Sequence, residues 1–324
     1  MATFKTIFMY QEPWEAERFE NAFGDEMQVV AIHQRTDIAT VGEENYDADM
    51  IVGGGVRSID TGRLFTKLKL IQTLSAGTDW IPKMELSEMG VRVANNQGGN
   101  SVAVAEVTVV LMVSTYRHLM VQWNQMNNLG TYAEGFSTDW ARFHELTGKR
   151  VGIIGLGQIG GAVAKRLQGW GCEVVYHDIA TYSAEYEAAA NAKKVDFHEL
   201  IETSDIVSLH VPLDRSTRAL LSDREFKMMK PDAIVVNACR GPVIDEAALI
   251  RALDDNQIAG AGLDVTEIEP IEMTNSLLGR PNVVLLPHRA GTSIEARQKS
   301  VDNSIANARR LMADEDPEGI VLPV

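Results

Sequence analysis

The amino-acid sequence predicts an α/β protein with two doubly wound parallel sheets, one in each of two domains. Short apolar strands alternate with helical stretches along most of the 324 residues, and such alternation indicates parallel strands covered by helices on both faces. A glycine-rich turn of the phosphate-binding type lies near the middle of the chain. The length also exceeds what one small core needs, which favours two domains.

The charge of the chain limits the class of partner. The formal net charge is −15 and 23% of the residues are charged, whereas nucleic acids and anionic membranes bind basic surfaces. We therefore expect neither of them as a partner. The longest apolar stretch, residues 107–113, is far too short to span a bilayer, and residues 1–10 lack the basic region and cleavage site of a secretory signal.

The two cysteines, Cys172 and Cys239, do not make a disulfide framework and fit a reducing compartment, so we expect a cytoplasmic protein. Core packing is the expected role of Cys172. Cys239 stands beside Arg240, a candidate catalytic residue, so its thiol is either a packed side chain or a reactive group. No spacing of Cys, His and carboxylate residues resembles a zinc site, and we expect no metal.

The first hundred residues alternate strands and helices. Strands are expected at 4–9, 27–33, 50–52, 70–74 and 91–94, with helices at 14–23, 58–67 and 81–89. Two of the strands end in glycine-containing breaks, at residues 53–55 and 75–79. Because open α/β sheets bind ligands at the carboxyl ends of their strands, both breaks are expected at a ligand site.

A long helix that contains Glu106 is expected from residue 100 to 118, and a looser region at 127–146 leads to the turn Gly155-Leu156-Gly157-Gln158-Ile159-Gly160. This turn follows an apolar strand at 150–154 and opens a helix expected at 159–170. Gly155 allows the tight turn, Gly157 leaves room for a phosphate, and Gly160 lets helix and strand pack closely.

A second strand, expected at 172–176, ends just before Asp178. A carboxylate at that distance beyond the glycines is placed to accept hydrogen bonds from a ribose 2′-hydroxyl. Strand, turn and helix together therefore predict a dinucleotide site. The alternative is an ordinary glycine-bearing turn in which Asp178 caps a loop.

The alternation resumes with strands expected at 206–210, 233–237, 259–264 and 283–286, and the chain ends in a helix at 293–313. A nucleotide domain from residue 100 to 286 leaves both termini outside it. We therefore predict one discontinuous substrate domain made of residues 1–99 and 287–324, with a cleft between the two domains.

Three residues that follow apolar strands are candidates for catalysis. Arg240 can hold a carboxylate through two parallel hydrogen bonds and polarise an adjacent carbonyl. His288 can exchange a proton near neutral pH, and a neighbouring carboxylate such as Glu269 would stabilise its charged form. The alternatives are a packing arginine, a solvated glutamate and a histidine without a chemical role, because spacing alone does not bring the three together.

Several motifs in order make the chain resemble the D-isomer-specific 2-hydroxyacid dehydrogenase family, which includes phosphoglycerate, glyoxylate/hydroxypyruvate and D-lactate dehydrogenases. The resemblance covers essentially the whole chain. The motifs are SAGTD from residue 75, NNQGGNSVAVAE from 95, GLGQIG from 155, SLHVPLDRSTRALL from 208, VNACRG from 236, DVTEIEP from 264 and PHRAG from 287. The longer run SAGTDWIP is most similar to the glyoxylate/hydroxypyruvate reductase-like branch.

The resemblance implies a flavodoxin-like substrate domain, an inserted Rossmann NAD-binding domain, and a homodimer with residues 119–147 as a contact region. It implies an NAD-dependent oxidoreductase, in practice a 2-oxo acid reductase, that moves hydride between nicotinamide C4 and the C2 of a small 2-oxo or 2-hydroxy acid. Arg240 would bind the carboxylate and carbonyl of that acid, and His288 would be the acid/base. Glu269 would hydrogen-bond the imidazole and keep it protonated until needed.

The resemblance also assigns binding residues. Backbone amides around Gly54, Gly55 and Gly77 would grip the substrate carboxylate, together with Arg240 and His288. The residues implied to contact the cofactor are Gly155, Gly157, Gln158, Ile159, Gly160, Asp178, His210, Val211, Pro212, Thr217, Ala238, Cys239, Arg240, Asp264 and His288. His210 is expected in the cofactor loop rather than as an acid/base.

Arg289 departs from the family, which usually has a small or apolar residue after the catalytic histidine. It would either contact an acidic substrate tail or make a surface ion pair. The most similar branch often prefers NADP, with an arginine after the second strand. Here Asp178-Ile179-Ala180-Thr181 offers a carboxylate and no nearby cation, so a 2′-phosphate would be repelled and NAD is predicted.

Two other functions stay open within this fold. The corepressor branch resembles these enzymes but works as a nucleotide-sensing binding protein, and the three catalytic-type residues can persist there. A formate-dehydrogenase-like enzyme is disfavoured, because that family has glutamine at the position of Glu269 and needs no proton transfer. Oxidation of NADH by a 2-oxo acid would separate an enzyme from a binding protein.

Overall fold

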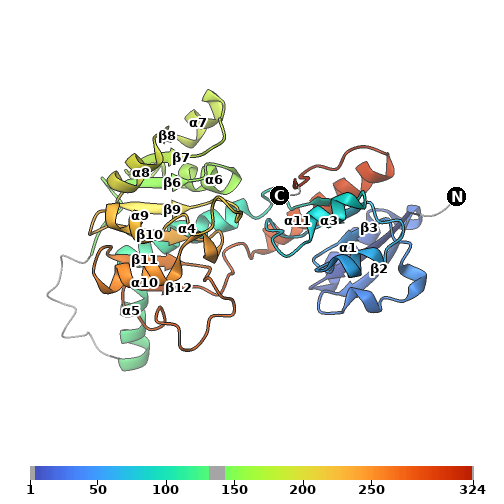
Figure 1. The fold of residues 1–324 in the computed structure, drawn as a ribbon, viewed down its shortest axis with the longest axis horizontal. Helices are drawn as coiled ribbons and strands as arrows, with labels where there is room; N and C mark the ends of the chain where they lie inside the picture. Colours follow the sequence, from blue (N-terminus) through green and yellow to red (C-terminus); the bar gives the residue numbers. More distant parts are fainter. Residues whose placement is uncertain (1–3, 131–142, 323–324) are drawn as a thin grey trace. The chain divides into compact units, whose positions relative to one another are not determined.

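The computed structural model describes residues 4–130 and 143–322, which form two compact units (Figure 1). The first unit contains the chain up to Asn100 and from Thr292 onward, and the second contains Ser101–Gly291. The second boundary between the units lies after Gly291, whereas the sequence predicted it after residue 286. The reason is that residues 288–290 donate backbone hydrogen bonds to Asp264, which lies in the second unit.

The first unit is built on five parallel strands in the order β2-β1-β3-β4-β5. The strands are β1 (Phe4–Tyr10), β2 (Met27–His33), β3 (Met50–Val52), β4 (Leu70–Gln72) and β5 (Arg92–Ala94). The order reverses beside β1, which pairs with both β2 and β3. This is the flavodoxin-like order, and such sheets bind ligands at the carboxyl ends of the strands that flank the reversal.

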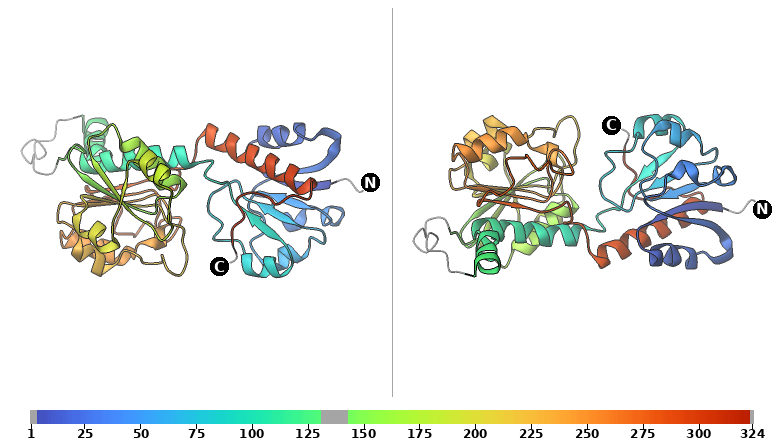
Figure 2. Two further views of the ribbon diagram at one scale, coloured as in Figure 1. Left: turned by 90° about the horizontal axis from the view of Figure 1, so that it is seen from above. Right: turned by 90° about the horizontal axis from the view of Figure 1, so that it is seen from below.

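Helices cover both faces of the first sheet. They are α1 (Pro13–Asn21), α2 (Ile59–Arg63), α3 (Lys83–Glu88) and α11 (Ile294–Met312). Phe19 of α1 and Leu311 of α11 pack around Phe8 on one face, where the two helices contact each other (Figure 2). Leu86 of α3 packs with Ile51 on the other face. Burial on both faces explains why these strands read as continuous apolar runs.

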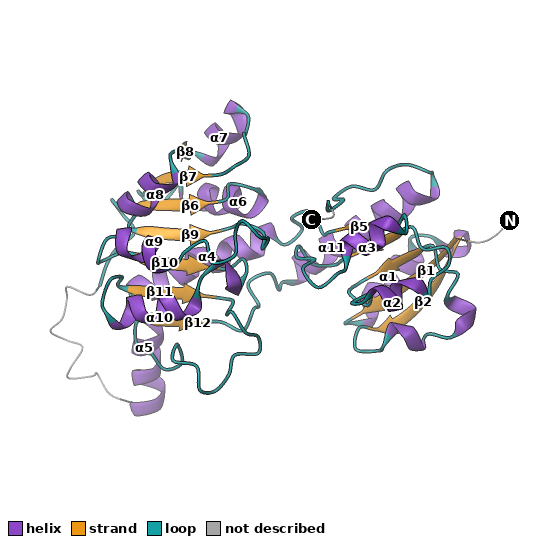
Figure 3. Ribbon diagram, viewed as in Figure 1, coloured by secondary structure: helices purple, strands orange, loops and turns teal. Residues whose placement is uncertain are grey.

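The second unit has seven parallel strands in the order β12-β11-β10-β9-β6-β7-β8 (Figure 3). The strands are β6 (Arg150–Ile154), β7 (Glu173–His177), β8 (Lys193–Lys194), β9 (Ile206–Leu209), β10 (Ile234–Asn237), β11 (Gly260–Leu263) and β12 (Val283–Leu285). The order reverses between β6 and β9, as in a Rossmann sheet. The turn at 155–160 follows β6 at this reversal, which is where such sheets bind dinucleotides.

Two helical layers enclose the second sheet. Its helices are α4 (Ser101–Tyr116), α5 (Leu119–Asn124), α6 (Gln158–Leu167), α7 (Ala184–Ala190), α8 (Phe197–Thr203), α9 (Asp223–Met228) and α10 (Glu246–Asp254). Val109 of α4 and Val163 of α6 pack on one face with Ile153, and Leu200 of α8 and Leu249 of α10 pack on the other. The predicted class, two doubly wound parallel sheets, is confirmed.

Within the described part of the chain, no single helix has both the length and the apolar character needed to cross a membrane. Helix α4 and the segment Leu119–Asn128 have sufficient length and apolar character only when they are taken together, and this pair is bent by 74° at the break between them. Most of α4 is buried in the second unit.

Candidate active site

The three glycines of the turn between β6 and α6 have different roles. Gly155 has φ +91°, and a Cβ there would lie 2.6 Å from the carbonyl oxygen of His210, so this position requires glycine. A Cβ on Gly160 would lie 2.0 Å from the carbonyl oxygen of Gly155. At Gly157 the atom that a Cβ would meet is the Tyr182 hydroxyl oxygen, 4.0 Å away. The backbone at Gly157 is therefore open enough for a phosphate, and the cradle fits a dinucleotide.

Asp178 follows β7 and is bound to the glycine turn. Its Oδ2 accepts a hydrogen bond from the Leu156 N–H at 2.8 Å, and its Oδ1 accepts one from the Ala180 N–H at 2.8 Å. The carboxylate thus ties the end of β7 to the turn and also caps its own loop. Loop capping leaves room for ribose recognition, because a carboxylate has about four acceptor sites.

The run 178–181 carries no cation of its own, but the fold brings one to this loop. Lys194 donates a hydrogen bond from Nζ to the carbonyl oxygen of Ala180 at 3.0 Å. Parallel pairing of β8 with β7 sets Lys194 opposite Tyr176, so the ammonium group reaches the loop that follows β7. Strand β8 consists of two lysines and has no apolar pattern, which is why this pairing could not be expected from the sequence.

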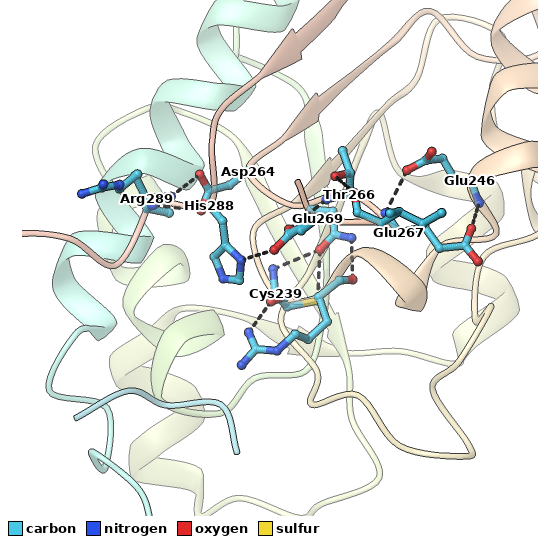
Figure 4. A network of polar contacts seen from close by, with 12 residues as sticks. Cys239, Glu246, Asp264, Thr266, Glu267, Glu269, His288 and Arg289 are labelled. Carbon is cyan, nitrogen blue, oxygen red and sulfur yellow. Dashed lines mark hydrogen bonds and ion pairs between the residues drawn. The ribbon is translucent and has the colours of Figure 1, made fainter. Parts of the chain in front are cut away.

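The loop after β12 is held by Asp264, which follows β11 (Figure 4). The Asp264 carboxylate accepts hydrogen bonds from the N–H groups of Arg289 at 2.9 Å and Ala290 at 2.8 Å. The N–H of His288 donates to the carbonyl oxygen of Asp264 at 2.8 Å. These bonds hold His288 at φ +54°, a left-handed conformation that residues other than glycine rarely adopt. Such backbone strain persists only where the surroundings fix the residue.

Asp264 is 1% exposed. Burial raises the pKa of its carboxyl group, while the two amide hydrogen bonds act in the opposite direction. The family resemblance implied a cofactor contact for this residue. In the structure both carboxylate oxygens bind the loop that carries His288, so the observed role of Asp264 is to position that loop.

Glu269 and His288 form the central pair of the site (Figure 4). The Oε2 of Glu269 lies 2.7 Å from the Nδ1 of His288, and its Oε1 accepts a hydrogen bond from the Thr266 N–H at 3.2 Å. The two side chains are 37% and 46% exposed, so a small molecule can reach them. Because a carboxylate only accepts hydrogen bonds, Nδ1 carries the hydrogen, and Nε2 is the nitrogen left to exchange a proton.

The loop after β10 carries Arg240 and is held by Asn237. The Asn237 side chain donates to the carbonyl oxygen of Arg240 at 2.9 Å and accepts from the Cys239 N–H at 3.0 Å. The Nη1 of Arg240 donates to the carbonyl oxygen of Cys239 at 2.6 Å. A Cβ on Gly241 would lie 1.8 Å from the carbonyl oxygen of Thr266. The backbone of the Arg240 loop therefore packs directly against the backbone of the loop that carries Glu269.

A small apolar cluster brings three of the predicted segments together. Ala238 from the loop after β10 packs with Ala290 from the histidine loop and with Val104 of α4, and Ile159 of the glycine turn packs against the same cluster. The structure thus gathers the Arg240 loop, the Glu269–His288 pair and the glycine turn at one edge of the second sheet, at the carboxyl ends of β6, β10, β11 and β12.

The thiol of Cys239 has a packing role. Burial raises its pKa to about 11, and its Sγ donates to the Oδ1 of Asn237 at 3.1 Å. The thiol is therefore protonated near neutral pH and is a poor nucleophile. Cys172 is also a free cysteine. Across residues 4–130 and 143–322, no three His, Cys, Asp or Glu side chains are grouped so that they could hold a metal ion.

Two residues of the predicted cofactor loop use their side chains internally. The Nε2 of His210 lies 2.9 Å from the Ser208 hydroxyl, and burial lowers the pKa of His210 to about 3, so this imidazole is neutral near pH 7. The Thr217 hydroxyl donates to the carbonyl oxygen of Pro212 at 2.7 Å and accepts from the Asp214 N–H at 2.8 Å. Thr217 therefore closes its own loop, a role that the motif alone did not reveal.

The first unit has a pocket of about 630 Å³ at the carboxyl ends of its strands, and Gly54 and Gly55 are among its lining residues. A Cβ on Gly55 would lie 2.4 Å from the Sδ of Met9, so glycine there serves packing as well. Gly77 is not a lining residue. Arg35 and Arg57 also line the pocket, and sequence reasoning missed both because isolated arginines in loops follow no pattern.

Of the two roles expected for Arg289, the surface ion pair is not observed among the described residues, and the contact with a substrate tail stays a prediction. Its side chain is exposed and points away from the imidazole of His288 (Figure 4). It makes no ion pair with any residue that the structure describes. What the structure does show is a backbone role, since the Arg289 N–H binds the Asp264 carboxylate.

Known proteins resemble this chain in sequence and in structure. Residues 109–290 match the family model described as D-isomer specific 2-hydroxyacid dehydrogenase, NAD binding domain. A glyoxylate reductase of Thermofilum pendens is 37% identical over 254 residues, which cover 78% of this chain and 75% of that protein. The apo form of D-mandelate dehydrogenase from Rhodotorula graminis matches with a TM-score of 0.86 and 26% identity, covering 99% of this chain and 98% of that one. An acyclic imino acid reductase in complex with NADPH and D-Arg matches with a TM-score of 0.82 and 28% identity, covering 98% and 100%.

Proposed function

Since the chain belongs to the D-isomer-specific 2-hydroxyacid dehydrogenase family, we propose that it reduces a small 2-oxo acid with His288 as the acid/base. The protein is an NAD-dependent oxidoreductase acting on CH–OH groups. The observation that carries the proposal is the 2.7 Å contact between the Oε2 of Glu269 and the Nδ1 of His288. A carboxylate–imidazole pair of this kind is suited to proton exchange near neutral pH.

In the proposed reaction, each residue of the site in the second unit has a separate role in proton transfer or substrate binding. The nicotinamide cofactor, when bound, would supply hydride as NADH for reduction and would accept hydride as NAD+ in the reverse reaction. Nε2 of His288 gives a proton to the keto oxygen of the substrate during reduction and takes it back during oxidation. Glu269 fixes the ring through Nδ1, and Asp264 fixes the backbone of the same histidine. Arg240 binds the substrate carboxylate through charge-assisted hydrogen bonds.

We propose that the first unit is the substrate domain and that the second is the nucleotide domain. The net charge of −15 repels an anionic substrate, so local cations are needed to attract one. The pocket of the first unit offers the backbone at Gly54 and Gly55 together with Arg57. A small 2-oxo acid such as glyoxylate fits this chemistry, and a relative carries the name glyoxylate reductase.

The test is a panel of 2-oxo acids that includes glyoxylate, hydroxypyruvate and phenylpyruvate, each with NADH and with NADPH. We expect at least one acid of the panel to oxidise NADH. The reaction is measured as the loss of the absorbance of the reduced nicotinamide. Binding of NADH without oxidation by any acid of the panel would contradict the proposal. That result would favour a nucleotide-sensing binding protein of the corepressor type.

We also propose that the protein is a homodimer. Large apolar side chains are exposed along α4, α5 and the π-helical segment Gln125–Leu129, with Val110 at 58%, Met120 at 42%, Trp123 at 58% and Met126 at 48%. Such a concentration of exposed apolar side chains is typical of an interface between protein chains. Of the contact region expected at 119–147, residues 131–142 lie outside the described part of the chain.

The free state of both cysteines supports a reducing compartment, and the cytoplasm is the location that we propose. Partial burial raises the pKa of Cys172, and Cys239 is buried. Recovery of the protein with the cytoplasmic fraction after cell fractionation is the expected result.

A further inference from the structure

Tyr182 contacts the carboxylate that is expected to read the ribose. Its hydroxyl donates a hydrogen bond to the Oδ2 of Asp178 at 2.8 Å, the same oxygen that accepts the Leu156 N–H. We propose that Tyr182 is a specificity-determining residue, which fixes the orientation of the Asp178 carboxylate and thereby sets the preference for NAD over NADP.

The hydrogen bonds at Asp178 leave the carboxylate little freedom to turn. Oδ2 accepts from Leu156 and Tyr182, and Oδ1 accepts from the Ala180 N–H. Three donors occupy three of about four acceptor sites, so a site on Oδ1 remains for a sugar hydroxyl. A ribose with a free 2′-hydroxyl can donate to that site, whereas a 2′-phosphate has only acceptors to offer there and carries like charge.

Tyr182 is itself held rigidly against the glycine turn. Its ring stacks on that of Tyr186 with centroids 5.0 Å apart and an interplanar angle of 21°. The hydroxyl of Tyr186 lies 3.1 Å from the carbonyl oxygens of both Leu156 and Gly157. A Cβ on Gly161 would lie 2.4 Å from that hydroxyl, so the second glycine of the pair 160–161 makes room for Tyr186. The two tyrosines therefore link the loop after β7 to the turn that receives the phosphates.

Rigidity matters here because a cation binds the loop that begins at Asp178. Lys194 donates to the carbonyl oxygen of Ala180, two residues beyond Asp178. A carboxylate that could turn away would leave the Lys194 ammonium as the dominant local charge, and a 2′-phosphate would then be tolerated. With the hydroxyl of Tyr182 in place, the carboxylate stays where a 2′-phosphate would meet it.

The inference rests on the cofactor and not on the proposed reaction, so it is tested by binding alone. The dissociation constants of NADH and NADPH are measured by fluorescence for the full chain without any 2-oxo acid. We expect the wild-type protein to bind NADH at least about 10-fold more tightly than NADPH. Tyr182→Phe should weaken NADH about 10-fold and affect NADPH much less, as loss of a hydrogen bond to a charged group predicts.

Tyr46→Phe is the matched control, because it removes a hydroxyl that contacts a backbone carbonyl oxygen, that of Ala39, in the first unit. It should leave the NADPH to NADH ratio within about 2-fold of wild type, and a melting curve shows that both variants are folded. An unchanged ratio in Tyr182→Phe would overturn the proposal. Tighter binding of NADH by that variant would also overturn it. Such a result would mean that the Tyr182 hydroxyl and the ribose compete for the same carboxylate oxygen. A failure of turnover with 2-oxo acids contradicts the proposed function and leaves this ratio unaffected.

Discussion

The Oε2 of Glu269 lies 2.7 Å from the Nδ1 of His288, and that histidine has a left-handed backbone at φ +54°. A non-glycine residue in this conformation costs on the order of 1–3 kcal/mol. The hydrogen bonds between Asp264 and residues 288–290 stabilise the conformation. Three hydrogen bonds from this loop to Asp264, one to its carbonyl oxygen and two to its carboxylate, therefore fix the backbone that carries the imidazole. Such support is expected of a histidine with a chemical role.

The first prediction concerns this pair. His288→Ala should lower kcat by about 10²–10⁴-fold, the usual contribution of a general acid/base, while the Kd of NADH stays near the wild-type value. Glu269→Gln should lower kcat less than His288→Ala does. The imidazole loses its charged partner at Nδ1, but its Nε2 can still exchange a proton with the substrate. Glu267→Gln is the control, since Glu267 on the same loop binds the N–H of Glu246 at 3.4 Å instead. Full activity of His288→Ala in steady-state assays would remove His288 from the mechanism.

The second prediction concerns Arg240, whose loop is fixed by Asn237. Arg240→Ala should raise KM and lower kcat together, because the guanidinium contacts the substrate in both the ground state and the transition state. A loss of about 100-fold in kcat/KM corresponds to the roughly 3 kcal/mol that charge-assisted hydrogen bonds contribute. Arg251→Ala, which breaks an exposed pair with Asp223, should change neither constant. Unchanged steady-state constants in Arg240→Ala would exclude a substrate contact.

Much of the fold could be predicted from the sequence, because strands buried on both faces read as apolar runs. The expected strands at 27–33, 50–52 and 150–154 coincide with β2, β3 and β6. The glycine turn could also be predicted, since Gly155 and Gly160 are required by backbone contacts that no other residue allows. Helices α7 to α10 are short, and each shows too few turns to establish a helical period.

The contacts around Asp178 and Asp264 could not be predicted. Both depend on side chains that bind backbone groups far away in sequence, and such bonds leave no periodic pattern. Strand β8 illustrates the limit, because two exposed lysines bring the ammonium of Lys194 to the loop after β7 only through strand pairing. The order of the strands in each sheet could not be predicted from the apolar pattern either. It could be expected only from the family resemblance.

The third prediction concerns the packing of the glycine turn. Gly160→Ala places a Cβ 2.0 Å from the carbonyl oxygen of Gly155, so the turn must shift, at a cost of about 1–3 kcal/mol for overpacking. We expect a lower melting temperature and at least 10-fold weaker binding of NADH. Gly169→Ala is the matched control, because a Cβ there meets nothing within 4 Å. Wild-type NADH binding by Gly160→Ala, measured by fluorescence titration, would show that the turn does not shape the cofactor site.

The fourth prediction concerns the exposed apolar surface of α4 and α5. Replacement of Val110 and Trp123, each 58% exposed, by lysine would place two charges in a homodimer interface. The mass measured by light scattering should then fall from that of two chains to that of one. Met273→Lys is a control, since Met273 is 89% exposed and lies elsewhere in the chain. A wild-type mass of one chain at micromolar concentration would contradict the proposed dimer.

The last prediction concerns the pH dependence of stability and rests on Asp205. Its Oδ2 accepts the Arg150 N–H at 2.7 Å, and its Oδ1 accepts the Lys230 ammonium at 2.7 Å. Although burial opposes the effect, these bonds hold the pKa of Asp205 below its usual value. The carboxylate therefore contributes stability that is present above the unfolded pKa of about 3.9 and is lost as the pH falls through the lower folded value.

Asp205→Asn should accordingly lower the free energy of unfolding by about 1.5–3 kcal/mol at pH 7. Denaturant titrations of the variant and the wild type should differ by a constant amount between about pH 5 and pH 8. Below about pH 4 the difference should shrink, because the wild-type carboxylate becomes protonated as well. Asp223→Asn, at the exposed pair with Arg251, should have a much smaller effect at every pH. A difference for Asp205→Asn that persists unchanged down to pH 2 would mean that packing of the side chain, and not its charge, stabilises the start of β6.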